Sequence, residues 1–290
     1  MPNNIVKILT MLDNNIICHC KDISIPVGIS MTFHNHDGYE ILLMLNGEAE
    51  FYTESSAKKM ERGDVFLISP YAFHHVHLLD NTCYNRIVLN FRTFVIPDLS
   101  SDATDLSSIF SRTPPKQINF IHLDEDEINR FLELCYALNE SLSSHAFGSD
   151  ILTEALSKQI LVEVNRYGKL SISQSFHQNM PALITDIFAY IDQHLTEEDF
   201  SVQTLADALR YNSSYLNRCF KKIAGTSLQQ YIIAKKIALS QEYLRKSYSV
   251  SEACYAAGFG NYSNFSRTFS NLTGLSPKQY QLLQVNPSPP

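Results

Sequence analysis

Two histidines and a glutamate near residue 35 are of the side-chain types that bind divalent metals. His34 and His36 are two residues apart, and Glu40 follows four residues later. On an extended strand, residues two apart point to the same face, so both imidazoles would reach one centre. Imidazole with one carboxylate suits Fe, Mn, Ni, Cu or Zn and leaves coordination positions open. The spacing predicts either a divalent-metal site or a polar cluster that lines a ligand pocket.

Arginine, lysine and serine side chains recur near the C-terminus, where the chain repeats itself weakly. Segment 200–227 aligns with 248–276 at an offset of 48 residues, which becomes 49 after one insertion. Each copy has the pattern of a short helix, a tight turn and a second helix, which is a helix-turn-helix. Arg218 and Arg267 fall at the same position of the two copies. The repeat predicts helix-turn-helix units at about 201–224 and 249–273.

The second helix of each copy separates into an apolar stripe and a polar face. The stripes, predicted to face the core, are Leu216, Phe220 and Ile223 in the first copy and Phe265, Phe269 and Leu272 in the second. A solvated surface helix would also be polar, but an Arg at the same outward position of both copies favours DNA contact, because Arg, Asn and Ser read base edges and Lys binds phosphates. The predicted DNA-binding residues are Ser214, Asn217, Arg218, Lys221, Lys222, Tyr262, Ser263, Ser266, Arg267 and Lys278.

One continuous helix is predicted between the two copies. Ser227 would cap it, and apolar residues recur at helical spacing through 228–246. Nineteen residues span about 28 Å. That length is a little under the ~34 Å between successive major grooves on one face of DNA. The helix is therefore suited to hold two recognition helices in adjacent grooves.

Segment 187–282 resembles the DNA-binding domain of the AraC/XylS family of transcriptional regulators. The motifs that carry the resemblance are Leu205-Ala206, Ser214-Tyr215-Leu216-x-Arg218-x-Phe220-Lys221-Lys222, Gly225-x-Ser227, Gly258-Phe259, Phe265-Ser266-Arg267-x-Phe269 and Gly274-x-Ser276-Pro277-x-x-Tyr280. The departures from the family pattern are Lys236-Ile237 in place of Arg-Leu, Gln281 in place of Arg, and Gly260 in place of an acidic or polar residue. The resemblance implies binding to double-stranded DNA, to RNA polymerase and to a small-molecule effector, such as a sugar or related metabolite. A homodimer is expected because the apolar stripes on 128–142 and 152–164 exceed what one helical hairpin hides against a barrel.

Residues 5–95 are predicted to form short β-strands in a sandwich or barrel. Runs rich in Ile, Val, Phe and Tyr recur about every ten residues, with turn signals such as Asn46-Gly47 between them. Residues 97–120 are expected to form a covering loop with one short helix. The expected strands are Ile16–Cys18, Gly28–Phe33, Glu40–Leu45, Ala49–Thr53, Asp64–Ile68 and Arg86–Phe91.

The spacing Gly28-x5-His34-x-His36-x3-Glu40-x6-Gly47 is similar to the first cupin motif. Gly63-Asp64, Pro70 and His74 are similar to part of the second, whose closing Asn is replaced by Leu78. In metal-binding cupins the matching His34, His36, Glu40 and His74 would converge on one ion, but AraC-type sensor domains often retain such histidines without a known metal. We therefore predict no cofactor, with divalent metal weak or absent. The resemblance implies an effector pocket of His34, His36, Glu40, His74 and Arg86, with walls from Tyr39, Tyr52, Tyr71 and Phe73.

Helices are predicted from residue 124 onward. Asp124 and Glu127 form a capping box, and apolar spacing continues from there to Leu142. A second amphipathic helix is expected from Asp150 to Tyr167, ending at Gly168. The expected fold is α+β. It comprises a cupin-like effector-binding domain at 1–122, a helical dimerisation element at 123–168, a linker at 169–181 and an all-α DNA-binding domain at 182–290.

Composition and charge limit the class of protein. Of 290 residues, 44% are hydrophobic, which excludes wholesale disorder, and the length favours two domains. The sequence shows no run of roughly 18 uncharged apolar residues and no secretion signal, so we expect a cytoplasmic protein without membrane contact. The family resemblance implies that it is bacterial and nucleoid-associated. The six cysteines are read as reduced thiols. Residues 201–290 carry ten basic and three acidic side chains, so a basic module suited to a polyanion follows an acidic body.

These features predict a sequence-specific DNA-binding regulator that is not an enzyme. One alternative is a metal-dependent cupin enzyme with an appended DNA-binding module, which would keep stoichiometric metal through dialysis and turn over sugars or diols. Another is a constitutive DNA-binding protein whose cupin-like domain only dimerises. That protein would show no ligand-dependent change in DNA affinity.

Overall fold

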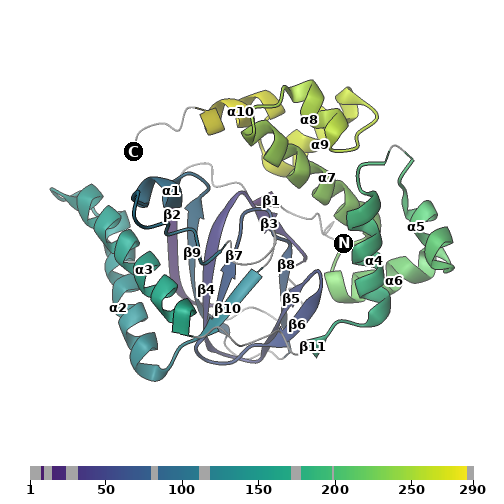
Figure 1. Cartoon of the computed structure of the whole chain (residues 1–290). Coiled ribbons are helices and arrows are strands. Elements are labelled where there is room, and N and C mark those ends of the chain that lie inside the picture. The colour runs from purple at the N-terminus through teal and green to yellow at the C-terminus, as the bar shows by residue number, and fades with distance from the viewer. Residues whose placement is uncertain are drawn as a thin grey trace.

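The chain has a β-rich N-terminal half and a helical C-terminal half (Figure 1). The computed structural model describes residues 8–9, 15–23, 32–79, 84–110, 118–170, 178–197 and 199–285. The predicted α+β class, with β-sheets followed by an all-α segment, is confirmed. Within the described residues, no helix is both long and apolar enough to cross a membrane.

Two antiparallel sheets form the β-rich half. The five-stranded sheet runs in the order β10 (Ile118–His122), β7 (Asp64–Ile68), β4 (Gly38–Asn46), β9 (Tyr84–Arg92) and β2 (Ile16–Ile23). The four-stranded sheet runs in the order β11 (Gln178–Asn179), β6 (Ser56–Lys59), β5 (Ala49–Thr53) and β8 (His74–Leu78). A parallel pair joins β1 (Ile8–Leu9) to β3 (Asn35–His36).

Side chains alternate between two faces along the strands, as the period of two requires. One face lies between the two sheets, where Leu42, Phe51, Phe66 and Val88 belong to one apolar cluster. The Phe51 and Phe66 rings stack with their centroids 4.1 Å apart. We call this space the intersheet interior. The opposite face of the five-stranded sheet is covered by the helical hairpin described next.

Helices α2 (Glu125–Ser143) and α3 (Ser149–Leu170) form a hairpin against the outer face of the five-stranded sheet (Figure 1). The capping box is confirmed, because Asp124 accepts from the Glu127 backbone and Glu127 from the Asp124 backbone. The expected end of the second helix at Gly168 is wrong. A Cβ at Gly168 would lie 2.2 Å from Ile109 Cδ1, so the glycine permits close packing inside a continuing helix.

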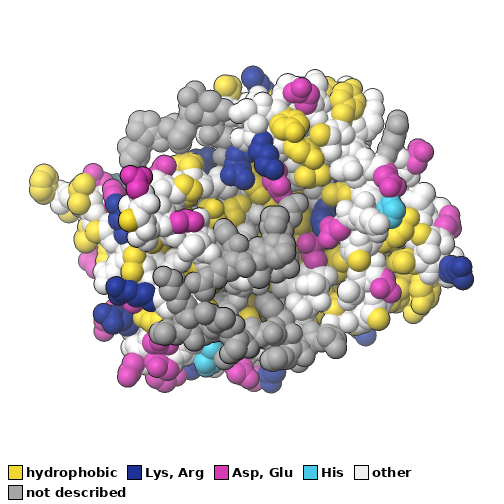
Figure 2. All heavy atoms as spheres, viewed as in Figure 1, with side chains coloured by type: hydrophobic (Ala, Val, Ile, Leu, Met, Phe, Trp, Pro, Cys, Tyr) yellow, Lys and Arg dark blue, Asp and Glu magenta, His cyan; other side chains and the backbone are white. Residues whose placement is uncertain are grey.

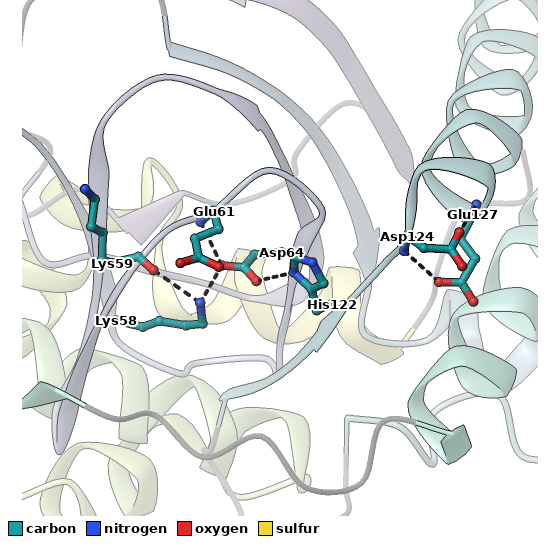
Figure 3. Close-up of polar contacts among 7 residues, drawn as sticks. All are labelled: Lys58, Lys59, Glu61, Asp64, His122, Asp124 and Glu127. Atoms are coloured by element: carbon teal, nitrogen blue, oxygen red, sulfur yellow. Dashed lines mark hydrogen bonds and ion pairs between the residues drawn. The ribbon is translucent and has the colours of Figure 1, made fainter.

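A buried carboxylate ties three strands together near the start of α2 (Figure 3). Asp64 accepts from Lys58 Nζ at 2.6 Å, the Glu61 backbone N–H at 2.9 Å and His122 Nδ1 at 3.0 Å. These residues lie on β6, the following turn, β7 and β10, and β10 leads directly into the hairpin. The Gly63-Asp64 motif therefore fixes the base from which α2 leaves the sheets.

The C-terminal half contains two successive helix-turn-helix units joined by one helix. Its elements are α4 (Ala182–His194), α5 (Val202–Leu209), α6 (Ser213–Ala224), α7 (Leu228–Arg245), α8 (Val250–Ala256), α9 (Tyr262–Thr273) and α10 (Pro277–Val285). Capping boxes at Ser201, Ser227 and Ser249 start α5, α7 and α8. The predicted core residues Leu216, Phe220, Phe265 and Phe269 are fully buried.

Several expected boundaries differ in the structure. The predicted linker 169–181 overlaps the end of α3, and its residues Gln178 and Asn179 pair with β6 as strand β11. Strands β6, β8 and β10 were not expected, because β6 and β8 are rich in Lys or His and β10 falls in the predicted covering loop. The short helix expected there is α1 (Val95–Leu99). Most of the expected strand Gly28–Phe33 lies outside the described residues, and Phe33 itself is in a bend.

Candidate functional site

The polar faces of α6 and α9 are open to solvent. Arg218 and Arg267 are both exposed, in keeping with their equivalent outward positions. Most of the predicted DNA-contacting residues share this exposure, namely Ser214, Arg218, Lys221, Lys222, Tyr262, Ser263, Arg267 and Lys278. Asn212 and Asn261 cap the two helices through their side chains, so each helix begins at the corresponding place of its copy.

Two of the predicted DNA-contacting residues are half-buried. Asn217 Oδ1 accepts from the Leu228 backbone N–H at 3.0 Å, so this side chain caps the start of α7. Ser266 lies one position before Arg267 and is also half-buried. In the sequence both are polar residues next to an Arg. The sequence does not show that Asn217 stabilises the connection between α6 and α7.

Helix α7 is packed against both helix-turn-helix units. Tyr231 and Ala234 lie in the core of the first unit, and Ile237 and Leu244 lie in that of the second. Lys236 donates to the Gly258 carbonyl at 2.7 Å. One helix of 18 residues that packs against both units therefore fixes the two polar faces relative to each other.

A second polar site lies in the intersheet interior. Ligand atoms of His36, Glu40 and His74 all lie within 4.8 Å of one another, and all three residues are buried. The Glu40 carboxylate lies 3.2 Å from His36 Nε2 and 3.7 Å from His74 Nε2, and it accepts from Asn90 Nδ2 at 2.8 Å. The His34 ring is stacked at 4.3 Å from His74. The structure thus brings together the four residues that the cupin-like motif implies, with His34 beside the other three.

The histidine tautomers follow from their backbone contacts. Nδ1 of His36 lies 2.8 Å from the Gly38 carbonyl, and Nδ1 of His74 lies 3.0 Å from the Ala72 carbonyl. A carbonyl only accepts, so each Nδ1 carries a proton and donates it. Nε2 of each ring is thereby directed at Glu40, and carbonyl-oriented imidazoles of this kind are typical of metal ligands.

Burial and the Glu40 charge set the protonation of this cluster. Burial lowers the pKa of His36, but Glu40, the Gly38 carbonyl and Asp37 together raise it more, so the net pKa shift is upward. Burial raises the pKa of Glu40, but His36, His74 and Asn90 together lower it more, so the net pKa shift is downward. Burial lowers the pKa of His34 and, more strongly, that of His74. A protonated His36 paired with an ionised Glu40 follows.

The donor set fits a divalent ion, and the ion must compete with the His36 proton. We expect purified protein to hold far less than one divalent ion per chain near pH 7. Metal affinity should rise with pH, because coordination releases that proton. Elemental analysis after dialysis and zinc titrations at pH 6 and pH 8 would check this. Near one ion per chain that is lost in His36→Ala would contradict it and favour the enzyme alternative.

The predicted pocket walls lie elsewhere. Tyr39 is on the outer face of β4, 4.8 Å from the Phe110 ring. Tyr52, Tyr71 and Phe73 belong to the cluster that packs on the C-terminal helices. Of the residues proposed from the sequence alone, Arg86 shares a face with Asn90. Sequence reasoning missed Tyr84 and Asn90, which lie on that face two residues before and four after Arg86.

The two halves of the chain are joined by an extensive contact. Phe33 and Phe73 pack on Tyr231 and Phe188, and the Phe33 N–H donates to the Ala224 carbonyl at 3.0 Å. Glu54, in the turn after β5, accepts from Tyr231 and Lys235 of α7, and Lys235 also pairs with Asp192 of α4. We call Glu54, Asp192, Tyr231 and Lys235 the interdomain polar cluster.

A second contact joins the halves at α10. The Tyr71 and Tyr280 hydroxyls are 3.0 Å apart. Tyr71 has a φ of 64°, a left-handed conformation that is uncommon for a bulky residue. Its backbone N–H donates to the His36 carbonyl at 2.9 Å. One residue therefore contacts both the histidine cluster segment and the last helix.

Two family models match the chain. Residues 27–161 match the AraC-like ligand binding domain, and residues 205–282 match a helix-turn-helix domain. The probable transcriptional regulator LumQ of Photobacterium leiognathi is 25% identical over 87% of this chain and 92% of its own length. The transcriptional activator RhaS of Enterobacter sp. (strain 638) is 23% identical over 85% of this chain and 86% of its own length.

Other matches are partial or distant. The chain spans only about a third, 32%, of an uncharacterized Staphylococcus aureus MSSA476 regulator that is 21% identical to it. Among solved structures, ToxT from Vibrio cholerae O395 aligns with 14% identity and a TM-score of 0.38 over 93% of this chain and 96% of its own.

Proposed function

Because the chain belongs to the AraC family of transcriptional regulators, with a ligand-binding domain before a helix-turn-helix domain, we propose that α6 and α9 read two blocks of one DNA site. The observation that carries this is the pair of exposed, equivalent Arg218 and Arg267 on helices fixed by α7. Exposed Lys221, Lys222 and Lys278 would bind the phosphate backbone.

Selection of duplexes from a random pool tests this function. The wild-type chain should enrich a motif of two blocks about one helical turn apart, since about 34–36 Å separates successive major grooves on one face. A chain that retains the fold but enriches no motif, or only a single block, would exclude the two-groove mode.

We propose that the effector binds in the intersheet interior and is a sugar or related metabolite. Glu40, Asn90, His34 and His74 offer hydrogen-bond acceptors and donors suited to hydroxyl groups. Strand β8 and the segment 33–36 carry the three histidines of this cluster, and the same segment contacts the C-terminal half.

The effector would change DNA binding through segment 33–36. Phe33 bonds to the end of α6, and the next residue, His34, pairs with His74 in the cluster. A ligand between these histidines changes the segment that α6 rests on. An effector shifts the equilibrium between arrangements only as far as it binds them differently, and this segment is in contact with both the site and the recognition helix.

We propose that the chain dimerises through the tip of the α2–α3 hairpin. Figure 2 shows hydrophobic side chains gathered at the far-left tip of the molecule, over this hairpin in Figure 1. The exposed large apolar residues there are Tyr136, Leu142, Phe147, Ile151 and Leu152. Leu156 is half-buried against the sheet, so it is a poorer probe of the interface than its exposed neighbours.

Ile151→Asp should convert a dimer to a monomer, because it places a charge in the centre of the apolar tip. Light scattering at micromolar concentration measures this, and the wild-type chain should have twice the mass of the variant. Tyr255→Asp, an exposed apolar position on α8, is the matched control and should remain dimeric. A wild-type monomer, or a variant that stays dimeric, would place the interface elsewhere.

The cellular role proposed is activation of transcription in the bacterial cytoplasm, on nucleoid DNA and in contact with RNA polymerase. The support is that a relative of similar length is named a transcriptional activator. The histidine cluster keeps the enzyme alternative testable, through the metal measurement above.

A further inference from the structure

A second polar pair lies in the intersheet interior, on the same face of β9 as Asn90. Alternation along β9 places Tyr84, Arg86, Val88 and Asn90 on one face. Tyr84 and Val88 belong to the interior apolar cluster, which fixes that face as the inner one. Met44, directly opposite Arg86 in the register with β4, is in the same cluster. The Arg86 side chain is therefore directed between the sheets.

Both side chains of this pair have polar atoms without protein partners. Arg86 Nη1 and the Tyr84 hydroxyl are buried and have no hydrogen-bond partner. The guanidinium carbon lies 4.8 Å from the centroid of the Tyr84 ring, so the two groups are adjacent. The Tyr84 side chain is only 1% exposed, so water does not replace the missing partner freely. Such atoms cost free energy unless a ligand satisfies them.

No carboxylate of the described residues neutralises Arg86. Glu40, an acid on the inner face, is already paired with His36 and accepts from Asn90. Among the described residues, Arg86 forms no ion pair within 4.0 Å, whereas Lys58 and Lys235, whose side chains are mostly buried, each pair with a carboxylate. The inner face thus carries a half-buried cation whose Nη1 is buried and which no acid of the described residues pairs.

We propose that Arg86 and Tyr84 bind an anionic oxygen group, a carboxylate or a phosphate, of the effector. This inference rests on the proposed effector-binding function. A guanidinium offers a planar fork of N–H donors that matches both groups. Burial raises the pKa of Tyr84 to about 12, so its hydroxyl remains a donor at physiological pH. The effector class is then a sugar acid, a sugar phosphate or a related anionic metabolite, whose hydroxyl groups the histidine cluster would bind.

Thermal unfolding of the full chain with minimal probes tests the proposal. Inorganic phosphate, acetate and neutral glycerol are titrated at constant ionic strength, with chloride as the balancing anion. We expect phosphate or acetate to raise the melting temperature in a saturable manner, and glycerol to show no saturable effect. Stabilisation by phosphate alone indicates a phosphorylated effector, and stabilisation by acetate a carboxylic acid.

Two substitutions identify the site. Arg86→Met should raise the half-saturating anion concentration at least tenfold. Without anion it should melt close to the wild type, because the removed charge is half-buried and has no carboxylate partner among the described residues. Arg62→Met removes the same charge from an exposed pair with Glu125 outside the interior and should leave the anion response unchanged. Should Arg86→Met fail to fold, Tyr84→Phe serves as the second variant, with an expected threefold to tenfold weakening.

The proposal is overturned if neither anion stabilises the wild type relative to chloride, or if the stabilisation persists in Arg86→Met. Duplex selection with the same preparations separates this failure from that of the proposed function. If a chain without an anion response still enriches a two-block motif, the proposed DNA-binding function stands and only the proposal of an anionic effector is excluded.

Discussion

Arg218→Ala should weaken binding to the selected DNA site by roughly tenfold to a hundredfold and leave binding to random DNA nearly unchanged. Arg218 is exposed on the outward face of α6. A bidentate contact from Arg to a base contributes about 1–3 kcal/mol of discrimination, and 1.4 kcal/mol corresponds to a factor of ten. Gel-shift titrations on the selected and scrambled duplexes measure both affinities.

Lys222→Ala is the matched control, since Lys222 is exposed one turn further along the same helix. A phosphate contact carries no sequence preference, so this variant should weaken both duplexes about equally and lower the salt slope by about one unit. Arg267→Ala should relax the preference in the second block only. If Arg218→Ala and Lys222→Ala gave the same selected motif and the same loss on random DNA, the assignment of the α6 face would be wrong.

Glu54→Met should destabilise the folded chain by about 3 kcal/mol. It leaves Lys235, whose side chain is 6% exposed, buried with Asp192 as its one remaining acid. Removing one partner of a buried pair is strongly destabilising, and the half-exposed Asp192 moderates the loss. Urea unfolding followed through the C-terminal helices, where Lys235 lies, measures the change.

The double variant Glu54→Met/Lys235→Met should recover the part of that loss that comes from the unpaired Lys235 charge, whereas the buried Tyr231 hydroxyl still lacks its Glu54 acceptor. Lys59→Met removes one partner of the exposed Glu48 pair and should change little. A Glu54→Met chain as stable as the wild type would show that the interdomain polar cluster does not hold the two halves together.

The helical half was predictable because its signals are local. Ser227 with Gln230 and Asp124 with Glu127 are capping boxes within four residues, and apolar spacing shows which side of α6 and α9 is buried. The exposure of Arg218 and Arg267 follows from the same spacing. Asn217 was not predictable, since its partner, the Leu228 backbone, is reached only after the chain turns.

The prediction of the pocket-wall residues was wrong for a different reason. A shift of one residue along a strand exchanges the two faces, so Tyr39 and Glu40 point to opposite sides of the same sheet. Which face is internal depends on the partner strands, which the sequence does not show. The contact between Glu54 and Lys235 joins residues 181 positions apart and carries no local signal. The wrong pocket walls and the missed contact between Glu54 and Lys235 both depend on pairing between residues that are far apart in the sequence.

The packing of α7 against both helix-turn-helix units has a consequence for how DNA sites of this protein can change over time. An added base pair turns one block about the duplex by about 35° and moves it about 3.4 Å. An added residue in α7 turns one unit by about 100° and moves it about 1.5 Å. The two displacements do not compensate for each other. A helix that packs against both units has no flexible joint that could absorb either displacement. The number of base pairs between the two blocks is therefore the part of the DNA site that stays constant, whereas the base sequence within each block can change.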